Sequence, residues 1–319
     1  MRQKYHVYIA SCDPQGGICH YEMSREGKLT LLDITPMDSP KYMILADDRM
    51  YVILRGGDAS GSGLQCFDID ADGKLCNPSA VQSTEGTEGC HVAVSGDAVY
   101  CANYGSGSII RMPDRLVCHT GKGVNPDRQE GPHAHYVGLT PDGKYLLAVD
   151  LGVDTVFQYD LELNLVAKTK MPDGHGPRHL TFSEDGKYCF VANELISSVT
   201  VCAYENERLT VLDTVSTLPA DFSGVSYCAA IRWRNGDIFV SNRGHNSVAK
   251  MKFADGKLTL DAVFDCSGDF PRDMNMIDDL MLCANQLSDD VTVLKETADG
   301  AFLQVNRVTV KTPLCVAFR

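Results

Sequence analysis

The chain has 319 residues, of which 44% are hydrophobic and 22% charged, and its formal net charge is −13. This is enough apolar material for a large core, and the length favours two domains or an array of repeats over one simple domain. The acidic balance argues against a nucleic-acid partner, which needs an extended basic surface. No secretory signal pattern opens the sequence, and apolar runs such as residues 50–54 are too short to cross a bilayer.

The N-terminal segment, residues 5–34, has the pattern of a four-stranded unit that lacks its first strand. From Ser39 onward, six units share one layout: an apolar run, a tight turn, a second apolar run ending in Asn, Asp or Arg, a polar loop, and one or two alternating runs. The turns lie at residues 47–48, 96–97, 142–143, 185–186, 235–236 and 278–279. Asp-Gly and Asn-Gly pairs predict two-residue hairpin turns, because both central positions need positive φ.

The units recur with a steady period. The residues that end the second run follow one another at intervals of 43 to 49 positions: Arg55, Asn103, Asp150, Asn193, Asn242 and Asn285. A period in this range with about four short strands is typical of propeller blades. The period argues against a β-sandwich, and the lack of alternating helices argues against a parallel α/β fold.

The C-terminal segment, residues 312–319, reads as an isolated first strand. If it joins the N-terminal unit, both lose their unpaired edges and a ring closes. We therefore predict an all-β fold and a single domain over residues 1–319. The domain is a seven-bladed β-propeller of four-stranded antiparallel blades, in which residues 312–319 complete the blade begun at Tyr5. The polar segment 119–135 is expected to form a loop over one face.

The cysteines are thirteen in number, odd, and without CxxC spacing. Many lie inside apolar runs, where a reduced cysteine behaves as a small buried hydrophobe. This favours free thiols in a reducing compartment, and we expect the protein to be cytoplasmic.

Residues equidistant from a hairpin turn face each other across the two strands. This count places Arg178 opposite Asn193, His135 opposite Asp150, Cys90 opposite Asn103, and Arg272 opposite Asn285. A register slip of one residue would change these facings without changing the end of the blade at which they lie. In other blades the position of Arg178 is taken by Pro40, Cys90, His135 or Ala229.

The first strand of each propeller blade lines the channel, so polar residues from several blades should meet at one mouth, where a ligand pocket is expected. They are Arg178, His179, Asn193, Glu194, His135, Asp150, Asn242, Arg243, Arg272 and Asn285. For Asn103, Asn242 and Asn285, capping of backbone groups at a strand end is the stronger interpretation. The repeat does not require the arginines or Glu194.

Four segments, at residues 131–152, 176–195, 240–248 and 270–279, resemble the seven-bladed lactonase family. That family includes the propeller-type 6-phosphogluconolactonases and the fungal 3-carboxy-cis,cis-muconate lactonizing enzymes. The resemblance implies a catalytic set at one channel mouth: His135 in PHAH, Arg178 in GPRH, Glu194 in NEL and Arg243 in SNRGH. Ala230 stands where members of the family commonly have an acidic residue.

These residue types suit an anionic lactone. Arg178 and Arg243 can bind a phosphate or carboxylate with two parallel hydrogen bonds, and one can stabilise the oxyanion formed when water attacks the carbonyl. Either Glu194 or His135 is the general base, and arginines beside Glu194 would favour His135 near neutral pH. The further residues expected to bind substrate are His179, Asp150, Asn193, Asn242, Arg272 and Asn285.

We expect no cofactor and no metal. His133 and His135 form an HxH pair without a third ligand at matching spacing, and a zinc site that adds His175 and His179 is disfavoured. No GxSxG motif indicates an acyl-enzyme.

The predicted function is hydrolysis of an anionic sugar-acid lactone, first of all 6-phosphogluconolactone to 6-phosphogluconate. Two alternatives remain: a cycloisomerase that closes a muconate-like carboxylate into a lactone, and a propeller that only binds. The expected partner is a small anionic lactone, with no nucleic acid and no membrane. The sequence leaves the oligomeric state open.

Overall fold

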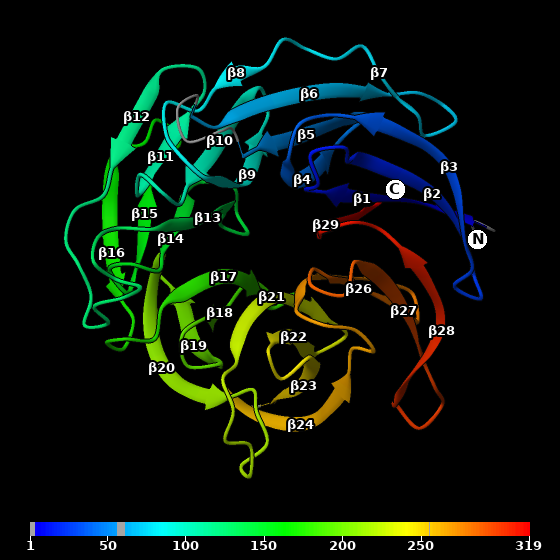
Figure 1. The fold of residues 1–319 in the computed structure, drawn as a ribbon. Coiled ribbons are helices and arrows are strands. Elements are labelled where there is room, and N and C mark those ends of the chain that lie inside the picture. The colour runs from blue at the N-terminus through cyan, green and yellow to red at the C-terminus, as the bar shows by residue number, and fades with distance from the viewer. Residues whose placement is uncertain (1–3, 56–60, 255) are drawn as a thin grey trace.

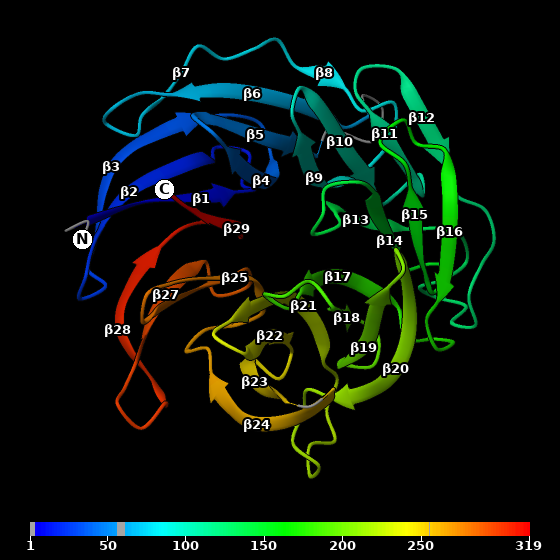
Figure 2. The ribbon, with the colours of Figure 1, turned by 180° about the vertical axis from the view of Figure 1, so that it is seen from behind.

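The structure, a computed structural model, describes residues 4–55, 61–254 and 256–319, and all regular structure among these residues is β-strand. Seven antiparallel sheets are arranged in a ring around a central axis (Figures 1 and 2). No helix in this part of the chain could cross a membrane. The predicted seven-bladed propeller is therefore confirmed.

The strands of each blade follow one another from the channel outward. The first blade comprises β29 (Pro313–Phe318), β1 (Lys4–Ser11), β2 (Gly17–Ser24) and β3 (Leu29–Pro36). The second comprises β4 (Pro40–Ala46), β5 (Arg49–Leu54), β6 (Gly63–Ile69) and β7 (Leu75–Cys76), with β8 (Gln82–Ser83) also paired to β6. The third comprises β9 (Gly89–Ser95), β10 (Ala98–Asn103), β11 (Ser108–Arg111) and β12 (Arg115–Cys118).

The fourth blade comprises β13 (Ala134–Leu139), β14 (Leu146–Asp150), β15 (Thr155–Tyr159) and β16 (Leu165–Lys170). The fifth comprises β17 (Pro177–Phe182), β18 (Tyr188–Asn193), β19 (Ser198–Glu205) and β20 (Arg208–Ser216). The sixth comprises β21 (Tyr227–Arg234), β22 (Asp237–Arg243), β23 (Ser247–Ala254) and β24 (Lys257–Asp265). The seventh comprises β25 (Pro271–Ile277), β26 (Leu280–Asn285), β27 (Asp290–Glu296) and β28 (Phe302–Thr309).

The ring is closed by the two ends of the chain. β29 pairs antiparallel with β1, so that Tyr8 lies opposite Ala317 and Ile9 opposite Val316. This pairing gives the N-terminal blade its innermost strand and confirms the predicted closure. It also removes two open sheet edges.

The hydrophobic cores lie between neighbouring blades. One core packs Val7, Ile9 and Val316 of the first blade against Leu282 and Val293 of the seventh. Strands in the middle of a blade are buried on both faces, whereas outermost strands such as β28 alternate towards solvent. The fold is therefore held by packing between sheets, with alternation visible only at the rim.

The innermost hairpins have two kinds of turn. Between β21 and β22, pairing continues to Arg234 and Asp237, which leaves Asn235 (φ 52°) and Gly236 (φ 89°) as the predicted two-residue turn. Between β17 and β18, pairing ends at Phe182 and Cys189, so the Asp185-Gly186 turn lies in a longer loop. The predicted centre of that hairpin is correct, and its loop length is not.

A β-bulge recurs near the channel mouth on the innermost strands. On β17 the register shifts between Pro177 and His179, so Pro177 lies opposite Asn193 and Arg178 is the bulged residue. Equivalent shifts leave Lys41, Cys90, His135 and Arg272 as the extra residues on β4, β9, β13 and β25. The predicted facings were therefore wrong by one residue: Asp150 faces Ala134, Asn103 faces Gly89, and Asn285 faces Pro271.

Candidate active site

The bulges bring successive side chains to the channel. In a regular strand, neighbouring residues point to opposite faces, whereas a bulge re-aims one of them. Accordingly, both Arg178 and His179 line the same narrow part of the channel, as do Lys41 and its neighbour Tyr42. In the sequence comparison, Pro40 took the position equivalent to Arg178. In the structure, Lys41 occupies that position.

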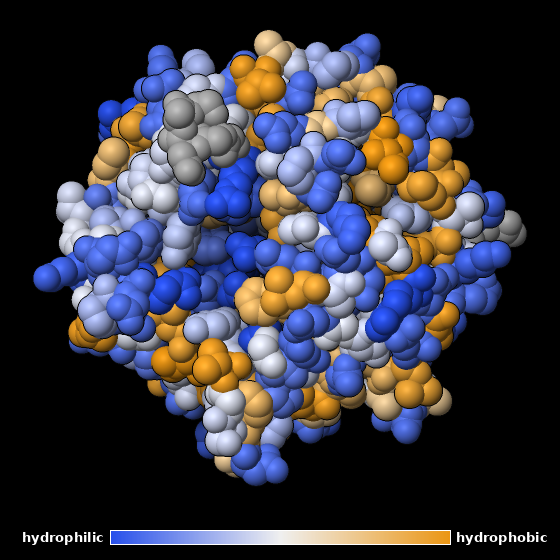
Figure 3. All heavy atoms as spheres, in the orientation of Figure 1, coloured by the Kyte–Doolittle hydropathy of each residue, from blue (hydrophilic) through white to orange (hydrophobic). Residues whose placement is uncertain are grey.

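A pocket of about 270 Å³ opens above this ring of bulges. The space-filling view shows a hollow at the centre of this face, lined mainly by hydrophilic residues (Figure 3). The pocket is lined by Lys41, Glu88, Cys90, Tyr104, Arg128, His135, Glu194, Tyr227, Arg243, Phe270 and Arg272. Four of these side chains are cationic and two are carboxylates, in a protein whose net charge is −13.

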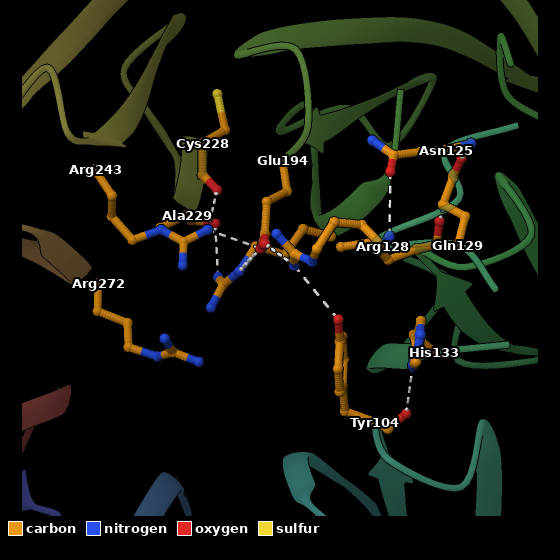
Figure 4. Close-up of polar contacts among 12 residues, drawn as sticks. Tyr104, Asn125, Arg128, Gln129, His133, Glu194, Cys228, Ala229, Arg243 and Arg272 are labelled. Carbon is orange, nitrogen blue, oxygen red and sulfur yellow. Dashed lines mark hydrogen bonds and ion pairs between the residues drawn. The ribbon is translucent and has the colours of Figure 1, made fainter. Parts of the chain in front are cut away.

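Glu194 is the centre of an ion-pair cluster (Figure 4). Its Oε2 lies 3.1 Å from Nε of Arg178 and 2.7 Å from Nη2 of Arg243, and its Oε1 lies 2.7 Å from Nη2 of Arg128. Glu194, Arg178 and Arg243 are buried, and Arg128 approaches from the more open side. The structure thus brings together three of the four residues predicted to be catalytic.

The cluster keeps Glu194 ionised. Burial alone would raise the pKa of this carboxyl, but Arg243 and Arg178 outweigh it and the pKa is lowered. Burial and the neighbouring Arg243 lower the pKa of the Arg178 guanidinium to about 9. Because Oε1 of Glu194 accepts a hydrogen bond from Arg128 and Oε2 forms ion pairs with Arg178 and Arg243, this carboxylate is a weak base that holds the guanidinium groups in place.

His135 lines the same pocket, and its side chain is buried. Its Nδ1 has no hydrogen-bond partner among the residues that the structure describes. Burial and Arg178 hold the pKa of this imidazole well below its usual range, so the ring is neutral at pH 7. Its neighbours are the rings of Tyr104 at 5.5 Å and His179 at 5.2 Å between centroids. A neutral histidine with an unpaired ring nitrogen can accept a proton, and the lowered pKa of His135 makes it a weaker base than an exposed histidine.

Arg128 was not predicted from the sequence. It comes from the polar segment 119–135, which reaches the pocket mouth. The segment is tied to the fourth blade because Nε2 of Gln129 donates to the carbonyl of Leu151 and to Asp154, both at 2.8 Å. Nothing in the repeat indicates where this insertion leads.

Tyr104, Tyr227, Phe270 and Lys41 also line the pocket without having been predicted. The guanidinium of Arg243 lies 5.2 Å from the ring centre of Phe270 and 5.9 Å from that of Tyr227, as expected of cation–π contacts. Tyr104 receives a hydrogen bond of 3.4 Å from Nη2 of Arg128. The aromatic side chains therefore contact the guanidinium groups of Arg128 and Arg243.

Of the further predicted binding residues, Arg272 lines the pocket and His179 lies deeper in the channel. The remaining four end their blades' second strands, are fully buried and are absent from the pocket lining: Asp150, Asn193, Asn242 and Asn285. Asp150 accepts from the backbone of His133 and from His119, and Asn242 donates to the carbonyl of Thr217. For these four the geometry favours a structural role over the predicted binding of substrate.

The HxH pair does not assemble a metal site in the described chain. His133 stacks on Tyr104, and its Nδ1 lies 3.0 Å from the carbonyl oxygen of that residue. No group of three His, Cys, Asp or Glu side chains within the described ranges is arranged to hold a metal ion. That the reaction needs no metal stays a prediction.

Below the pocket, the channel is filled by rings. His91 stacks on Tyr42 at 4.2 Å, and lies 4.3 Å from Tyr136 and 5.0 Å from His179 between centroids. Burial, followed by nearby arginines, holds the pKa of His91 and of His179 well below the usual value of 6.5. Both rings are therefore neutral in the folded protein.

We expect the protein to lose stability as the pH falls from about 7 to 5.5. In the folded protein the pKa values of His91, His135 and His179 lie below the usual value of 6.5. At a pH between the folded and the usual pKa, the unfolded chain therefore binds more protons than the folded chain. Each such histidine contributes up to about 1.4 kcal/mol per pH unit. Urea unfolding at several pH values measures this slope, and His91→Gln should flatten it. An unfolding free energy that stays constant over this range would contradict the burial of neutral histidines.

The class of protein follows from the match to a known family. A family model described as lactonase, 7-bladed beta-propeller, matches residues 6–318. The chain therefore belongs to the seven-bladed β-propeller lactonase family, which confirms the resemblance drawn from its motifs.

Individual relatives resemble the whole chain. The periplasmic gluconolactonase PpgL of Pseudomonas aeruginosa has a TM-score of 0.90 with it, at 27% identity over 99% of both chains. A protein of Lactobacillus plantarum has a TM-score of 0.89, at 31% identity over 99% of both chains. An uncharacterized protein of Staphylococcus aureus strain N315 is 32% identical over 98% of this chain and 99% of its own length. Membership of the lactonase family and similarity to this gluconolactonase together support lactone hydrolysis as the class of reaction.

Proposed function

We propose that this protein hydrolyses the lactone of an anionic sugar acid, and that its first candidate substrate is 6-phosphogluconolactone, opened to 6-phosphogluconate. The observation that carries the proposal is the convergence of cations, one ionised glutamate and one neutral histidine in a single pocket of an acidic protein. Its volume of about 270 Å³ suits a small ligand.

His135 is assigned as the general base. It takes a proton from the water that attacks the lactone carbonyl, and returns it to the ring oxygen when the carbon–oxygen bond breaks. Arg243 lines the pocket and is held at 2.7 Å by Glu194, so it is placed to stabilise the oxyanion without rearrangement. Glu194 acts as a positioning residue for Arg178 and Arg243.

A covalent route through Cys90 has little support. This thiol lines the pocket, but burial raises its pKa to about 11 despite the nearby cations, so it is protonated at pH 7. Its sulfur contacts the carbonyl oxygens of Ala134 and His135 at 3.4 and 3.5 Å. Direct attack by water is therefore the proposed step.

The test is a lactone panel with product analysis. 6-Phosphogluconolactone, gluconolactone and a muconate-type acid are each incubated with the protein, and rates are compared with the spontaneous reaction. Hydrolysis adds the mass of one water, whereas cycloisomerisation conserves mass. We expect accelerated hydrolysis of the phosphorylated lactone. Mass-conserving turnover of the muconate alone would assign a cycloisomerase, and no turnover of any compound would leave a binding protein.

We also propose a reducing compartment, the cytoplasm, for this chain. All thirteen cysteines are free, and burial raises the pKa of many, including Cys101, Cys189 and Cys283. Protonated, buried thiols need no disulfide partner. The Pseudomonas aeruginosa relative is periplasmic, so this proposal implies that compartments differ among the relatives.

A further inference from the structure

Two cations of the pocket are not paired with Glu194. Arg272 makes one hydrogen bond to a side chain, from Nη1 to Oε1 of Gln286 at 3.3 Å. The ammonium group of Lys41 forms no hydrogen bond or ion pair with the residues that the structure describes. The close-up shows the guanidinium of Arg272 pointing into the space that Arg243 and Glu194 also face (Figure 4).

The two cations come from strands that flank β29. β25 and β4 both pack against β29, which the ring order places across the channel from β17. β29 also has a register shift near the mouth, and the residue that this shift leaves unpaired is the apolar Leu314. Asp273, which follows Arg272 on β25, has its Oδ1 2.8 Å from Nη2 of Arg232 and is neutralised there. Within the described part of these strands, no carboxylate is therefore left unpaired between Lys41 and Arg272.

The remaining bulge positions supply no carboxylate either. They are occupied by Cys90, His135 and Arg178, and on β21 by Ala229 and Ala230. The other carboxylate of the pocket, Glu88, has its Oε1 3.0 Å from Nη2 of Arg55. Glu88 is thus paired with Arg55, and with four cations and two carboxylates the pocket keeps an excess of positive charge.

The environment of these cations is unfavourable without a counter-ion. Burial, followed by Arg243, lowers the pKa of Arg272, and burial is also the main cause that lowers the pKa of Lys41. Glu194 acts on Arg272 and Glu88 on Lys41 in the opposite direction, but burial outweighs them, so a bound anion would supply counter-charge that these cations lack.

We propose that Lys41 and Arg272 form an anion subsite that binds the charged substituent of the lactone, a phosphate or a carboxylate, across the channel from Glu194. The inference rests on the proposed function and extends it, because it assigns substrate selection to residues separate from the ion-pair cluster. Arg272 offers a planar fork of donors and Lys41 a compact ammonium, a combination suited to tetrahedral and planar anions alike.

The first test is a ratio of activities. In Lys41→Met and Arg272→Met, kcat/KM for 6-phosphogluconolactone should fall about 10- to 100-fold more than kcat/KM for neutral gluconolactone, mainly through KM. Glucarolactone, which carries a carboxylate instead of a phosphate, shows which anion the subsite prefers. Lys74→Met removes an exposed lysine with the same change in net charge and should leave the ratio unchanged. An unaltered ratio in both pocket variants would overturn the subsite.

The second test needs no catalysis. Calorimetric titration with 6-phosphogluconate and with inorganic phosphate should show binding to the wild type that weakens at least about 10-fold in both pocket variants. If the panel finds no lactone hydrolysis but this weakening is measured, the subsite stands and the proposed hydrolysis fails. If lactones are hydrolysed and binding is equal in all variants, the hydrolysis stands and the subsite fails.

Discussion

His135→Asn is expected to lower kcat for the anionic lactone by about 10²- to 10⁴-fold, the usual contribution of a general base. Asparagine keeps a polar side chain of similar size but cannot take the proton from water. Because the pKa of His135 is held well below 6.5 by burial and Arg178, the wild-type rate should stay level from pH 8 down to 6.5, without the loss that an exposed histidine would show. Initial rates across this range, corrected for spontaneous hydrolysis, measure both effects.

His245→Asn is the matched control for His135. His245 follows Arg243 at the same end of the sixth blade, hydrogen-bonds to Ser247 at 2.7 Å and is absent from the pocket lining. This variant should keep the wild-type rate and folding. Equal rates in His135→Asn and His245→Asn would remove His135 from the mechanism.

Glu194→Gln is expected to have the largest combined effect on stability and activity. It leaves Arg178 and Arg243 buried without their counter-charge, which costs about 3–5 kcal/mol of unfolding free energy. Loss of the held arginines should also lower kcat by about 10²- to 10³-fold. Because the pKa of Glu194 is lowered in the folded state, its stabilisation is present above about 4.5 and is lost as the pH falls below that value. Urea unfolding of both proteins at pH 7 and pH 4 measures the difference.

Glu207→Gln makes the same substitution in a surface ion pair. Glu207 lies 2.6 Å from Nζ of Lys144, and both side chains are substantially exposed, so the variant should lose no more than about 1 kcal/mol. The comparison separates burial from the chemistry of the substitution. Similar losses in the two variants would show that the Glu194 cluster is not a buried charge centre.

The repeat carried most of the fold prediction because each blade is a separate unit with its own turn. The missing first strand at Tyr5 and the extra strand at residues 312–319 were sufficient to predict closure, which β1 and β29 confirm. The same repeat placed Arg178, Glu194 and Arg243 at one mouth, and the ion pairs join them.

The bulges could not be predicted from the hairpin pattern. Counting outward from the turn gives the observed pairing as far as His179 opposite Ala192, and then fails at the next residue. The inner strands are buried on both faces and show little alternation, so the shift of phase that a bulge causes cannot be read from their sequence. For this reason Pro40 was compared with Arg178 when the channel position belongs to Lys41.

Arg128 illustrates a second limit. Its segment lies between two blades, and its path depends on contacts with the fourth blade, such as Gln129 with Asp154. Those contacts depend on tertiary structure, which a motif in one strand does not encode. The Asn and Asp residues at the ends of the second strands could be found from the sequence because they recur in the repeat. They recur because each blade needs their structural hydrogen bonds, so their recurrence did not indicate substrate binding.

The central claim is that His135 and the arginine cluster held by Glu194 act together on an anionic lactone in one pocket. The measurement that tests it most directly is a double-mutant cycle on the catalysed rate of 6-phosphogluconolactone hydrolysis, with wild type, His135→Asn, Glu194→Gln and the double variant. We predict that each single variant falls towards the spontaneous rate and that the double variant falls no further than the slower single variant. Full activity in both single variants, with the proteins folded, would contradict the account.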